Sequence, residues 1–536
     1  MSITPELFPI ARLHPLIDDP TVNCTFDNIL AMTDTEFESY VREMRAAFLT
    51  YWDTEGLPPR RGWTDDEIDK DFDKLSSVKL HEFWKTDELS GRRVIHNTHV
   101  STGSAVNAWH ASKMYQTRIN YTEKDDGKSI YDFFAKPELF ERYLPYARRH
   151  FLRDSFYMFA QTVTGGTPLS HRPEIIPTTA VDFITEFATH ERGYQEQELL
   201  LEAKLVSKGQ QYTGYNDKMR TSPLMVLTHA EYHAAIEAGL LPDITRRNIL
   251  PKHDHDHYEF HVRLYTKGQK LFPNLFRSFR ISMCQYAVNY PTLTAKLLYE
   301  TFLSHVDAET VRVWDPSSGW AGRLLGAMSY GPLTKPNQRL EYYGTDPNPA
   351  FYKAGTSVYC VIADRYNGIR AKQLYGVINA GTVYQLGSED FPQTPAYQQY
   401  VGKGDLVFTS PPYFNREAYS DDPNQSYKKF ASYKVWRDQF LRVTLQHTFD
   451  WLNHERYLLW NIADLKVGKK YLPLEQDSMQ IAQDIGYVYK ETILMALMNM
   501  PGANRVTEDG EATAKNYLKM NGKIMKYEPV HVFWKP

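Results

Sequence analysis

Hydrophobic and polar positions follow one pattern before residue 285 and another after it. In the first part, long segments of polar and aromatic residues show helical spacing, as in Asp34–Tyr51 and Glu196–Lys208. Loops such as Leu57–Gly62 and Thr164–Pro168 interrupt them. Apolar residues that recur every three to four positions favour amphipathic helices. The pattern predicts a large, mixed, mostly helical N-terminal domain over residues 1–285.

After residue 285, short apolar or β-branched runs alternate with helical segments. The runs are Val311–Asp315, Leu340–Thr345, Thr382–Leu386, Asp405–Ser410 and Tyr457–Ala463. Strands that alternate with helices at this spacing build βαβ units and a mainly parallel sheet. Right-handed crossovers place the carboxyl ends of these strands on one edge, where ligands bind. We therefore expect an α/β domain over residues 286–536, with its site at that edge.

Three turns at the expected strand ends contain residues that suit a nucleotide-like ligand. The glycines of Asp315–Arg323 permit close backbone approach, and the helix that follows offers unpaired N–H groups. The acidic residue of Gly344–Asn348 suits ribose hydroxyls, although it also suits a helix cap. In Gly387–Phe391 a carboxylate suits an adenine amino group and Phe391 its ring, and a plain loop is the alternative. Only the combination of these turns favours a cofactor site.

The fourth strand end carries two consecutive prolines, in Thr409-Ser410-Pro411-Pro412-Tyr413. Proline cannot donate to a strand ladder, so the strand must end there, and two fixed φ angles stiffen the loop. Such a loop holds the Ser410 hydroxyl and a backbone carbonyl in fixed directions beside an aromatic ring. Two acceptors and a ring suit the two hydrogens and the face of a base that carries an exocyclic amine.

Ser-Pro-Pro-Tyr after a strand, downstream of Asp-Pro-x-x-Gly-x-x-Gly, resembles the S-adenosylmethionine-dependent amino-methyltransferases of DNA, which make N4-methylcytosine or N6-methyladenine. Asn289–Pro291 followed by Ala295 is similar to their cofactor-contacting helix, and Tyr527–Phe533 to their final strand. The resemblance covers residue 289 to the end. It implies a Rossmann-like class I methyltransferase fold with a mainly parallel seven-stranded sheet.

The resemblance also implies roles for individual residues. The catalytic set is Ser410, Pro411, Pro412 and Tyr413, with Ser410 and the Pro411 carbonyl on the amine and Tyr413 stacked on the base. The S-adenosylmethionine set is Tyr290, Pro291, Asp315, Pro316, Ser318, Gly319, Gly322, Asp346, Asp390 and Phe391. The chain departs from the family at Ser317, where an aromatic residue is usual, and has Trp320 between the glycines. Serine at the first catalytic position tilts the expectation from adenine toward cytosine.

The implied reaction is methyl transfer to a base in double-stranded DNA, and the base must leave the stack to be reached. Hydrogen bonds from the amine to Ser410 and a carbonyl would favour a pyramidal nitrogen with a free lone pair. Positioning then supplies most of the catalysis, and no metal is needed. RNA or a protein side-chain amide is the alternative substrate. A catalytically silent nucleic-acid-binding protein of the same fold is the alternative from another class.

Composition and charge limit where the chain can contact nucleic acid. The 536 residues are 42% hydrophobic and 24% charged, with a net charge of −4, so any nucleic-acid contact must come from local basic patches. The candidates, which ordinary solvated faces would also explain, are Arg142, Arg148, Arg149, His150 and Arg153, and in the tail Lys515, Lys519, Lys523 and Lys526. Three scattered cysteines, no secretory start and no long apolar stretch favour a cytoplasmic protein without a membrane span.

Several other features have a plain interpretation. The alternating histidines of His253–His257 suit a metal on one strand face, but polar surface before a strand at Tyr258–Leu264 is favoured. Trp314 and Trp460 are expected in the core. A helical acidic stretch contains Asp65, Asp66, Asp69 and Asp71, and is expected to be solvated.

Two further expectations concern the substrate. The polar segment Phe414–Tyr427 is expected to form a lid, or a simple solvent loop, and its Arg416 is a candidate phosphate contact. Little room remains in Lys466–Lys526, so most substrate recognition is expected in residues 1–285. The sequence leaves the oligomeric state open, with a dimer as one option.

Overall fold

The computed structural model describes residues 32–55, 63–98, 102–119, 127–142, 287–332, 334–372, 378–467, 470–497 and 516–536, apart from single gaps, with three strands and a few single residues elsewhere. The chain divides into two compact units. The first comprises Met1–Leu13, Arg61–Asp132 and Gln285–Pro536, and the second His14–Arg60 and Phe133–Cys284.

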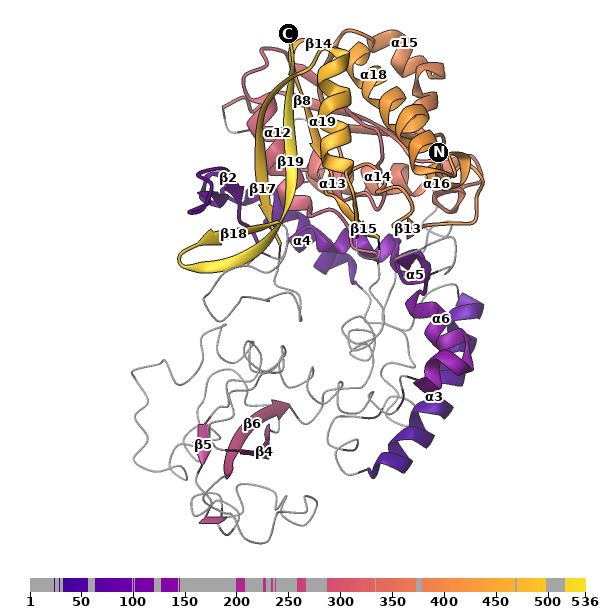
Figure 1. Cartoon of the computed structure of the whole chain (residues 1–536), viewed down its shortest axis with the longest axis vertical. Coiled ribbons are helices and arrows are strands. Elements are labelled where there is room, and N and C mark those ends of the chain that lie inside the picture. The colour runs from indigo at the N-terminus through magenta and orange to yellow at the C-terminus, as the bar shows by residue number, and fades with distance from the viewer. Residues whose placement is uncertain are drawn as a thin grey trace. The chain divides into compact units, whose positions relative to one another are not determined.

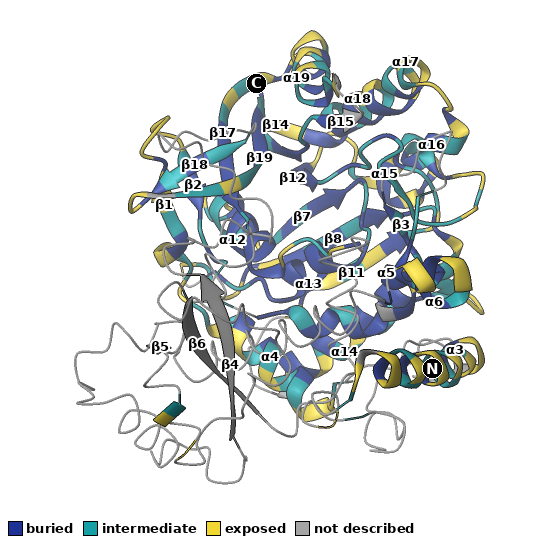
Figure 2. Cartoon of the chain, turned by 60° about the horizontal axis from the view of Figure 1, so that its bottom comes forward, coloured by how far each residue is buried: buried dark blue, intermediate teal, exposed yellow. Residues whose placement is uncertain are grey.

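A ten-stranded sheet forms the centre of the first unit (Figure 1). Its order is β1-β2-β17-β19-β14-β12-β7-β8-β11, with β18 paired to β19 (Figure 2). Its strands are β1 (Trp84–Thr86), β2 (Arg93–Ile95), β7 (Thr310–Asp315), β8 (Arg339–Thr345), β11 (Ala380–Tyr384), β12 (Gly404–Thr409), β14 (Leu452–Asn461), β17 (Val488–Ala496), β18 (Tyr517–Met520) and β19 (Lys523–Lys535). Neighbouring strands from β11 to β14 are parallel, whereas β19 is antiparallel to both β14 and β17.

This topology confirms the predicted Rossmann-like α/β fold. Counted in chain order, the seven main strands after residue 285 lie 3-2-1-4-5-7-6 across the sheet. The strand order reverses between β7 and β12, and open α/β sheets bind ligands at such a switch point. The five runs predicted as strands are β7, β8, β11, β12 and β14, with ends shifted by up to five residues. The strands β1, β2 and β18 extend the expected seven to ten.

Two hydrophobic cores cover the two faces of the sheet, because alternate residues of each strand point to opposite sides. Val313, Leu406 and Phe408 belong to one core, and Trp314 and Val407 to the other. The first core packs on the helices α12 (Thr292–Leu303), α13 (Gly322–Met328) and α14 (Val358–Lys372). The second packs on α15 (Pro395–Tyr400), α18 (Arg442–Trp451) and α19 (Leu474–Ile485).

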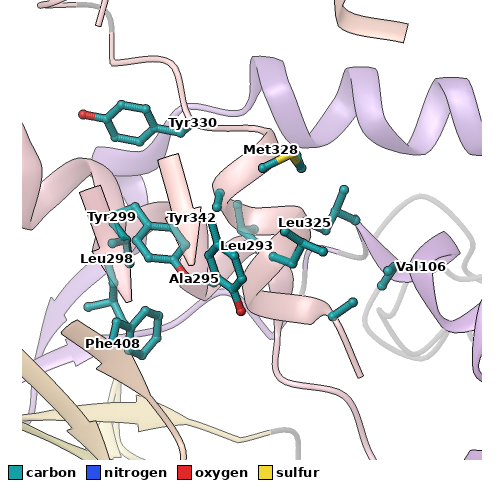
Figure 3. Packing of buried hydrophobic residues seen from close by; sticks show 14 of the residues in the cluster. Val106, Leu293, Ala295, Leu298, Tyr299, Leu325, Met328, Tyr330, Tyr342 and Phe408 are labelled. Carbon is teal, nitrogen blue, oxygen red and sulfur yellow. The ribbon is translucent and has the colours of Figure 1, made fainter. Parts of the chain in front are cut away.

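Burial is deepest in the centre of the sheet, where every residue of β12 is buried (Figure 2). Trp314 and Trp460 have no exposed surface, which confirms their prediction as core. Figure 3 shows how α12 meets the strands, with Leu298 and Tyr299 beside Phe408. The Tyr299 and Phe408 rings contact edge to face, with centroids 5.4 Å apart. Such contacts fix the helix that leads into the site.

Residues 61–132 belong to the unit that carries the sheet, although the sequence analysis grouped them with residues 1–285. Strand β2 pairs in parallel with β17. The buried Lys296 ammonium of α12 donates to the carbonyls of Leu75 and Ser76, 3.1 and 2.8 Å away, at the end of α4 (Asp65–Ser77). A cation suits the carboxyl end of a helix. The substrate role of residues 1–285 stays a prediction.

The acidic stretch on α4 is only partly solvated, contrary to expectation. The Asp71 carboxylate accepts the backbone N–H groups of Gly103 and Ala105, at 3.0 and 2.8 Å. Asp69 pairs with Arg365 of α14. These two carboxylates therefore connect α4 to its neighbours, and burial raises the pKa of Asp71.

In the second unit, one predicted helix is confirmed and another is wrong. Helix α3 (Asp34–Glu55) confirms the helix expected at Asp34–Tyr51. The helix expected at Glu196–Lys208 is instead strand β4 (Leu199–Ser207), paired along its whole length with β6 (Tyr258–Thr266). Strand β5 (Met225–Leu227) completes this antiparallel sheet. A short apolar run does not distinguish helix from strand by its period, and long-range pairing decided this one.

Some expectations lie outside the described residues. These are the histidines His253–His257 and the basic residues Arg148, Arg149, His150, Arg153 and Lys515. The strand expected at Tyr258–Leu264 is confirmed as β6. No helix within the described ranges is long and apolar enough to span a membrane.

Candidate active site

The carboxyl ends of β7, β8 and β12 meet around the Asp315 carboxylate, which is fully buried. One oxygen accepts from Arg323 Nε at 2.7 Å and the Tyr342 hydroxyl at 2.6 Å. The other accepts from the Thr409 hydroxyl at 2.7 Å and the Ser317 N–H at 3.1 Å. Asp315 is therefore occupied by the protein itself, and its place in the structure is that of a positioning residue.

The turn after β7 is held against the end of β8. Ser318 N–H donates to the Thr345 carbonyl at 3.0 Å, and the Thr345 hydroxyl donates to the Pro316 carbonyl at 2.7 Å. Gly319 has a φ of 53°, and a Cβ at this position would meet no atom closer than 3.8 Å. The space beside the Gly319 backbone is therefore open, and cofactor binding by this glycine stays a prediction.

Asp346 lies beside that glycine at the end of β8. Its carboxylate accepts the backbone N–H groups of Gly319 and Asn348, each at 2.9 Å. Burial outweighs these two bonds and raises the pKa of Asp346 to about 6. Asp346 thus joins the glycine turn to β8 and keeps free lone pairs, because each carboxylate oxygen has two.

Gly322, in contrast, serves the packing of α13 against the residues that precede α12. A Cβ there would lie 2.3 Å from the Tyr290 carbonyl and 2.4 Å from Asn289 Oδ1. Its N–H donates to Asn289 Oδ1 at 3.0 Å, while Asn289 Nδ2 donates to the Trp320 carbonyl at 2.7 Å. The amide of Asn289 therefore caps α13, a role that sequence analysis missed. Pro291 is the residue before α12 and sets its start.

Trp320 supplies the aromatic surface that Ser317 lacks. Its ring lies edge-on to Phe351 and Tyr419, with centroids 5.4 and 5.8 Å away. The third neighbour is His110, at 5.6 Å. His110 Nε2 is buried with no hydrogen-bond partner in the described residues, and burial lowers the His110 pKa to about 3. No local sequence signal indicated that His110 would reach this turn.

The segment after β11 differs from expectation at one residue. Phe391 has no exposed surface and stacks on Trp314, with centroids 4.4 Å apart, so its ring is part of the core. Asp390 and Glu389 both accept from Lys429, at 2.9 and 2.8 Å. The second carboxylate oxygen of Glu389 is buried and has no partner in the described part of the chain. Glu389 was not singled out from the sequence.

The loop after β12 is fixed at both of its ends. Thr409 is bound to Asp315 at the beginning, and Phe414 lies in the core at the end, 5.8 Å from the Trp436 ring. Phe414 has a φ of 49°, an uncommon conformation for a residue with a side chain. Between these anchors Pro411 is buried, while Ser410, Pro412 and Tyr413 are half-buried. The loop therefore presents its polar and aromatic groups from a rigid support.

Two tyrosine hydroxyls at this edge are buried without hydrogen-bond partners among the described residues, those of Tyr290 and Tyr413. Burial raises the pKa of both, and the Glu528 carboxylate raises it further. Ser410 and the Ala463 N–H are polar neighbours of the Tyr413 hydroxyl. Buried polar groups are normally satisfied, so each exception calls for an explanation, and a bound group is one.

The Glu528 carboxylate, which acts on both hydroxyls, also acts on Glu417. Burial and the neighbouring Glu528 raise the pKa of Glu417 to about 7, against the opposing effect of Arg416. Burial likewise raises the pKa of Glu528. Glu417 belongs to β13 (Glu417–Ala418), which pairs with β3 (Arg118–Ile119). The segment expected as a lid is thus joined to residues 61–132, and neither carboxylate was anticipated.

The structure brings together at one edge of the sheet Tyr290, Asp315, Pro316, Ser318, Gly319, Asp346, Ser410 and Tyr413. Glu389 and Asp390 follow β11 on the same side, and Phe391 does not join the set. No group of three metal-ligating side chains occurs in the ranges that the structure describes.

The sequence matches no known family profile and no curated protein. Among solved structures, the chain is similar to a presumed DNA modification methylase from Thermus thermophilus, at 18% identity over 28% of this chain and 52% of that protein, with a TM-score of 0.19. TrmN from Thermus thermophilus gives 12% identity over 52% and 57%, with a TM-score of 0.23. An S-adenosylmethionine-dependent methyltransferase from Methanosarcina mazei gives 12% over 46% and 99%, with a TM-score of 0.25.

The chain spans about half the length of the DNA modification methylase that it matches.

Proposed function

We propose that this protein transfers a methyl group from S-adenosylmethionine to the exocyclic amine of a nucleic-acid base, with DNA as the substrate and N4 of cytosine favoured. The observation that carries the proposal is the Ser-Pro-Pro-Tyr loop, bound through Thr409 to Asp315 and so to the glycine turn. A rigid loop with an amine acceptor and an aromatic ring thereby lies beside a turn suited to a nucleotide-like cofactor.

The residues present fit S-adenosylmethionine. Gly319 offers open backbone, and the Asp346 carboxylate beside it has lone pairs left for ribose hydroxyls. The unpaired oxygen of Glu389 and the carboxylate of Asp390 offer acceptors for the adenine amino group. The unpartnered Tyr290 hydroxyl is a further polar group for the cofactor. Gly322, Asp315 and Phe391 do not contact the cofactor in this proposal. Their packing and hydrogen bonds hold the residues that do.

The bound cofactor supplies a methyl group on a positively charged sulfur, which is a good leaving group. The Ser410 hydroxyl and the Pro411 carbonyl accept hydrogen bonds from the amine and so direct the nitrogen lone pair. As the nitrogen–carbon bond formed and the sulfur–carbon bond broke, the nitrogen would lose one proton to solvent. Tyr413 stacks on the base and offsets part of the few kcal/mol that extrusion from a duplex costs. Pre-set acceptors need no reorganisation during the reaction, so positioning accounts for most of the rate.

One experiment tests the proposal directly. The purified protein is incubated with S-adenosylmethionine carrying a labelled methyl group and with duplex DNA, single-stranded DNA, RNA or a glutamine-containing peptide. Mass spectrometry of the digested products identifies the methylated atom. Labelled N4-methylcytosine or N6-methyladenine in DNA is the expected result. Label in RNA or peptide alone would correct the substrate, and absence of cofactor binding would support a silent protein.

A further inference from the structure

The residue that ends the turn after the catalytic loop is Arg416, and its backbone is fixed on both sides. Its N–H donates to the Tyr413 carbonyl at 3.0 Å. The next two residues form β13, which pairs with β3. Arg416 is therefore held between the residue whose ring stacks on the base and a short strand ladder.

The guanidinium of Arg416 is half-buried and has no ion pair or hydrogen bond within the described part of the chain. Three other arginines of this unit have carboxylate partners. Arg323 pairs with Asp315 at 2.7 Å, Arg312 with Glu341 at 3.2 Å and Arg456 with Asp405 at 3.3 Å. Withdrawing a charge from water without a partner is unfavourable, and burial accordingly lowers the pKa of Arg416.

Neighbouring charges offset the burial of Arg416 only in part. The adjacent Glu417 carboxylate raises the pKa of Arg416, but burial outweighs it, and no ion pair joins the two side chains within the described residues. Glu417 instead accepts a hydrogen bond from the Tyr419 hydroxyl. The other cations of residues 410–430 are already paired, Lys428 with Asp421 and Lys429 with Glu389 and Asp390. One unpaired cation thus remains directly after the loop that would hold the target base.

We propose that Arg416 binds a backbone phosphate next to the target nucleotide, so that the site takes a base as part of a nucleic-acid strand. This inference rests on the proposed function and deepens it. The planar fork of arginine suits two phosphate oxygens at once. Phosphate contacts fix register and orientation rather than sequence. A fixed phosphate beside Tyr413 would orient the extruded base toward Ser410.

The test compares Arg416→Met and Arg416→Lys with wild type, using a labelled DNA oligonucleotide at several salt concentrations. Arg416→Met should raise the KM for the oligonucleotide about tenfold or more. It should reduce the slope of log K against log salt by about 0.7 to 0.9, the contribution of one phosphate. Arg416→Lys should restore the salt slope but not the full affinity, because ammonium lacks the fork.

The matched control is Arg442→Met, which removes the same charge from a side chain that is paired with Asp484 and 45% exposed. It should leave the KM and the salt slope unchanged. Thermal melting separates binding from structure. Replacing the unpaired, half-buried charge of Arg416 with methionine should not lower Tm. The affinity of Arg416→Met for the cofactor should stay at the wild-type value.

An unchanged KM and salt slope in Arg416→Met, with wild type active on DNA, would overturn this inference alone. A large drop in Tm together with a general loss of activity would also overturn it, because Arg416 would then be structural. A wild-type protein that methylates peptide amides and no nucleic acid would overturn the proposed function, and this inference with it.

Discussion

The Thr409 hydroxyl donates to the Asp315 carboxylate at 2.7 Å, and this bond joins the ends of two adjacent parallel strands. Asp315 begins the glycine turn and Thr409 begins the proposed catalytic loop. The same carboxylate holds the buried guanidinium of Arg323. One side chain therefore sets the spacing between the two halves of the proposed site.

Thr409→Val should remove the hydrogen bond to Asp315 with little change in side-chain shape, so the distance between the two halves of the site is no longer fixed. Loss of a buried hydrogen bond to a carboxylate costs about 2 kcal/mol of unfolding free energy. We expect that loss in urea unfolding, and a fall in kcat larger than any change in cofactor affinity. Thr409→Ser keeps the hydroxyl and is the control. Wild-type stability and kcat in the valine variant would contradict the role assigned to this bond.

Ser410→Ala should lower kcat by about 10² to 10³, the usual effect of removing one positioned polar group in a transition state. Cofactor affinity should not change, because Ser410 is assigned to the amine. The measurement is steady-state methyl transfer beside calorimetric binding of S-adenosylmethionine. Full activity in Ser410→Ala would exclude the proposed mechanism.

Two variants of Tyr413 distinguish the contribution of the ring from that of the hydroxyl. Tyr413→Phe keeps the ring and should leave the KM for DNA unchanged, because stacking on a base needs the ring and not the hydroxyl. Tyr413→Ala should lose about 1 to 3 kcal/mol of base stacking, seen as a higher KM for DNA. Equal activity of the two variants would argue against stacking.

Asp346 gives a pH dependence of both stability and cofactor binding. Its pKa is about 6 in the folded protein, against an ordinary value of 3.8. Between these pH values the folded state binds more protons than the unfolded state, so this residue's contribution to stability falls as pH rises through that window. Ribose hydroxyls prefer the ionised carboxylate, so S-adenosylmethionine affinity should rise about tenfold from pH 5 to 7. Asp346→Asn should flatten both profiles in chemical unfolding and calorimetry, and an unchanged slope would contradict the assignment.

Gly322→Ala tests the close approach of α13 to the residues before α12. The added Cβ would overlap the Tyr290 carbonyl and the Asn289 side chain, so α13 or that segment must shift. Overpacking of this kind costs about 1 to 3 kcal/mol. The control is Gly368→Ala on α14, where a Cβ meets no atom within 4 Å and should increase stability slightly. Equal Tm values for the two variants would show that the contact is not restrictive.

The sequence predicted five strands after residue 285 and the turns at their ends, because short apolar runs followed by Gly, Asp or Pro turns are local signals. It did not predict which way Phe391 points, since that depends on packing against Trp314 across the sheet. His110, Glu417 and Glu528 reach the site through tertiary contacts and strand pairing, which no local spacing reveals. The strand at Leu199–Ser207 was missed for the same reason, because its partner lies more than fifty residues later.

The position of β19 between β14 and β17 has a consequence for biosynthesis. Until residues 523–535 have left the ribosome, β14 and β17 each present an unpaired edge, and β17 with β2 and β1 has no connection to the rest of the sheet. The sheet therefore cannot close during most of translation. Exposed strand edges invite pairing with other chains, so nascent or truncated forms of this protein should depend on chaperones far more than the finished one.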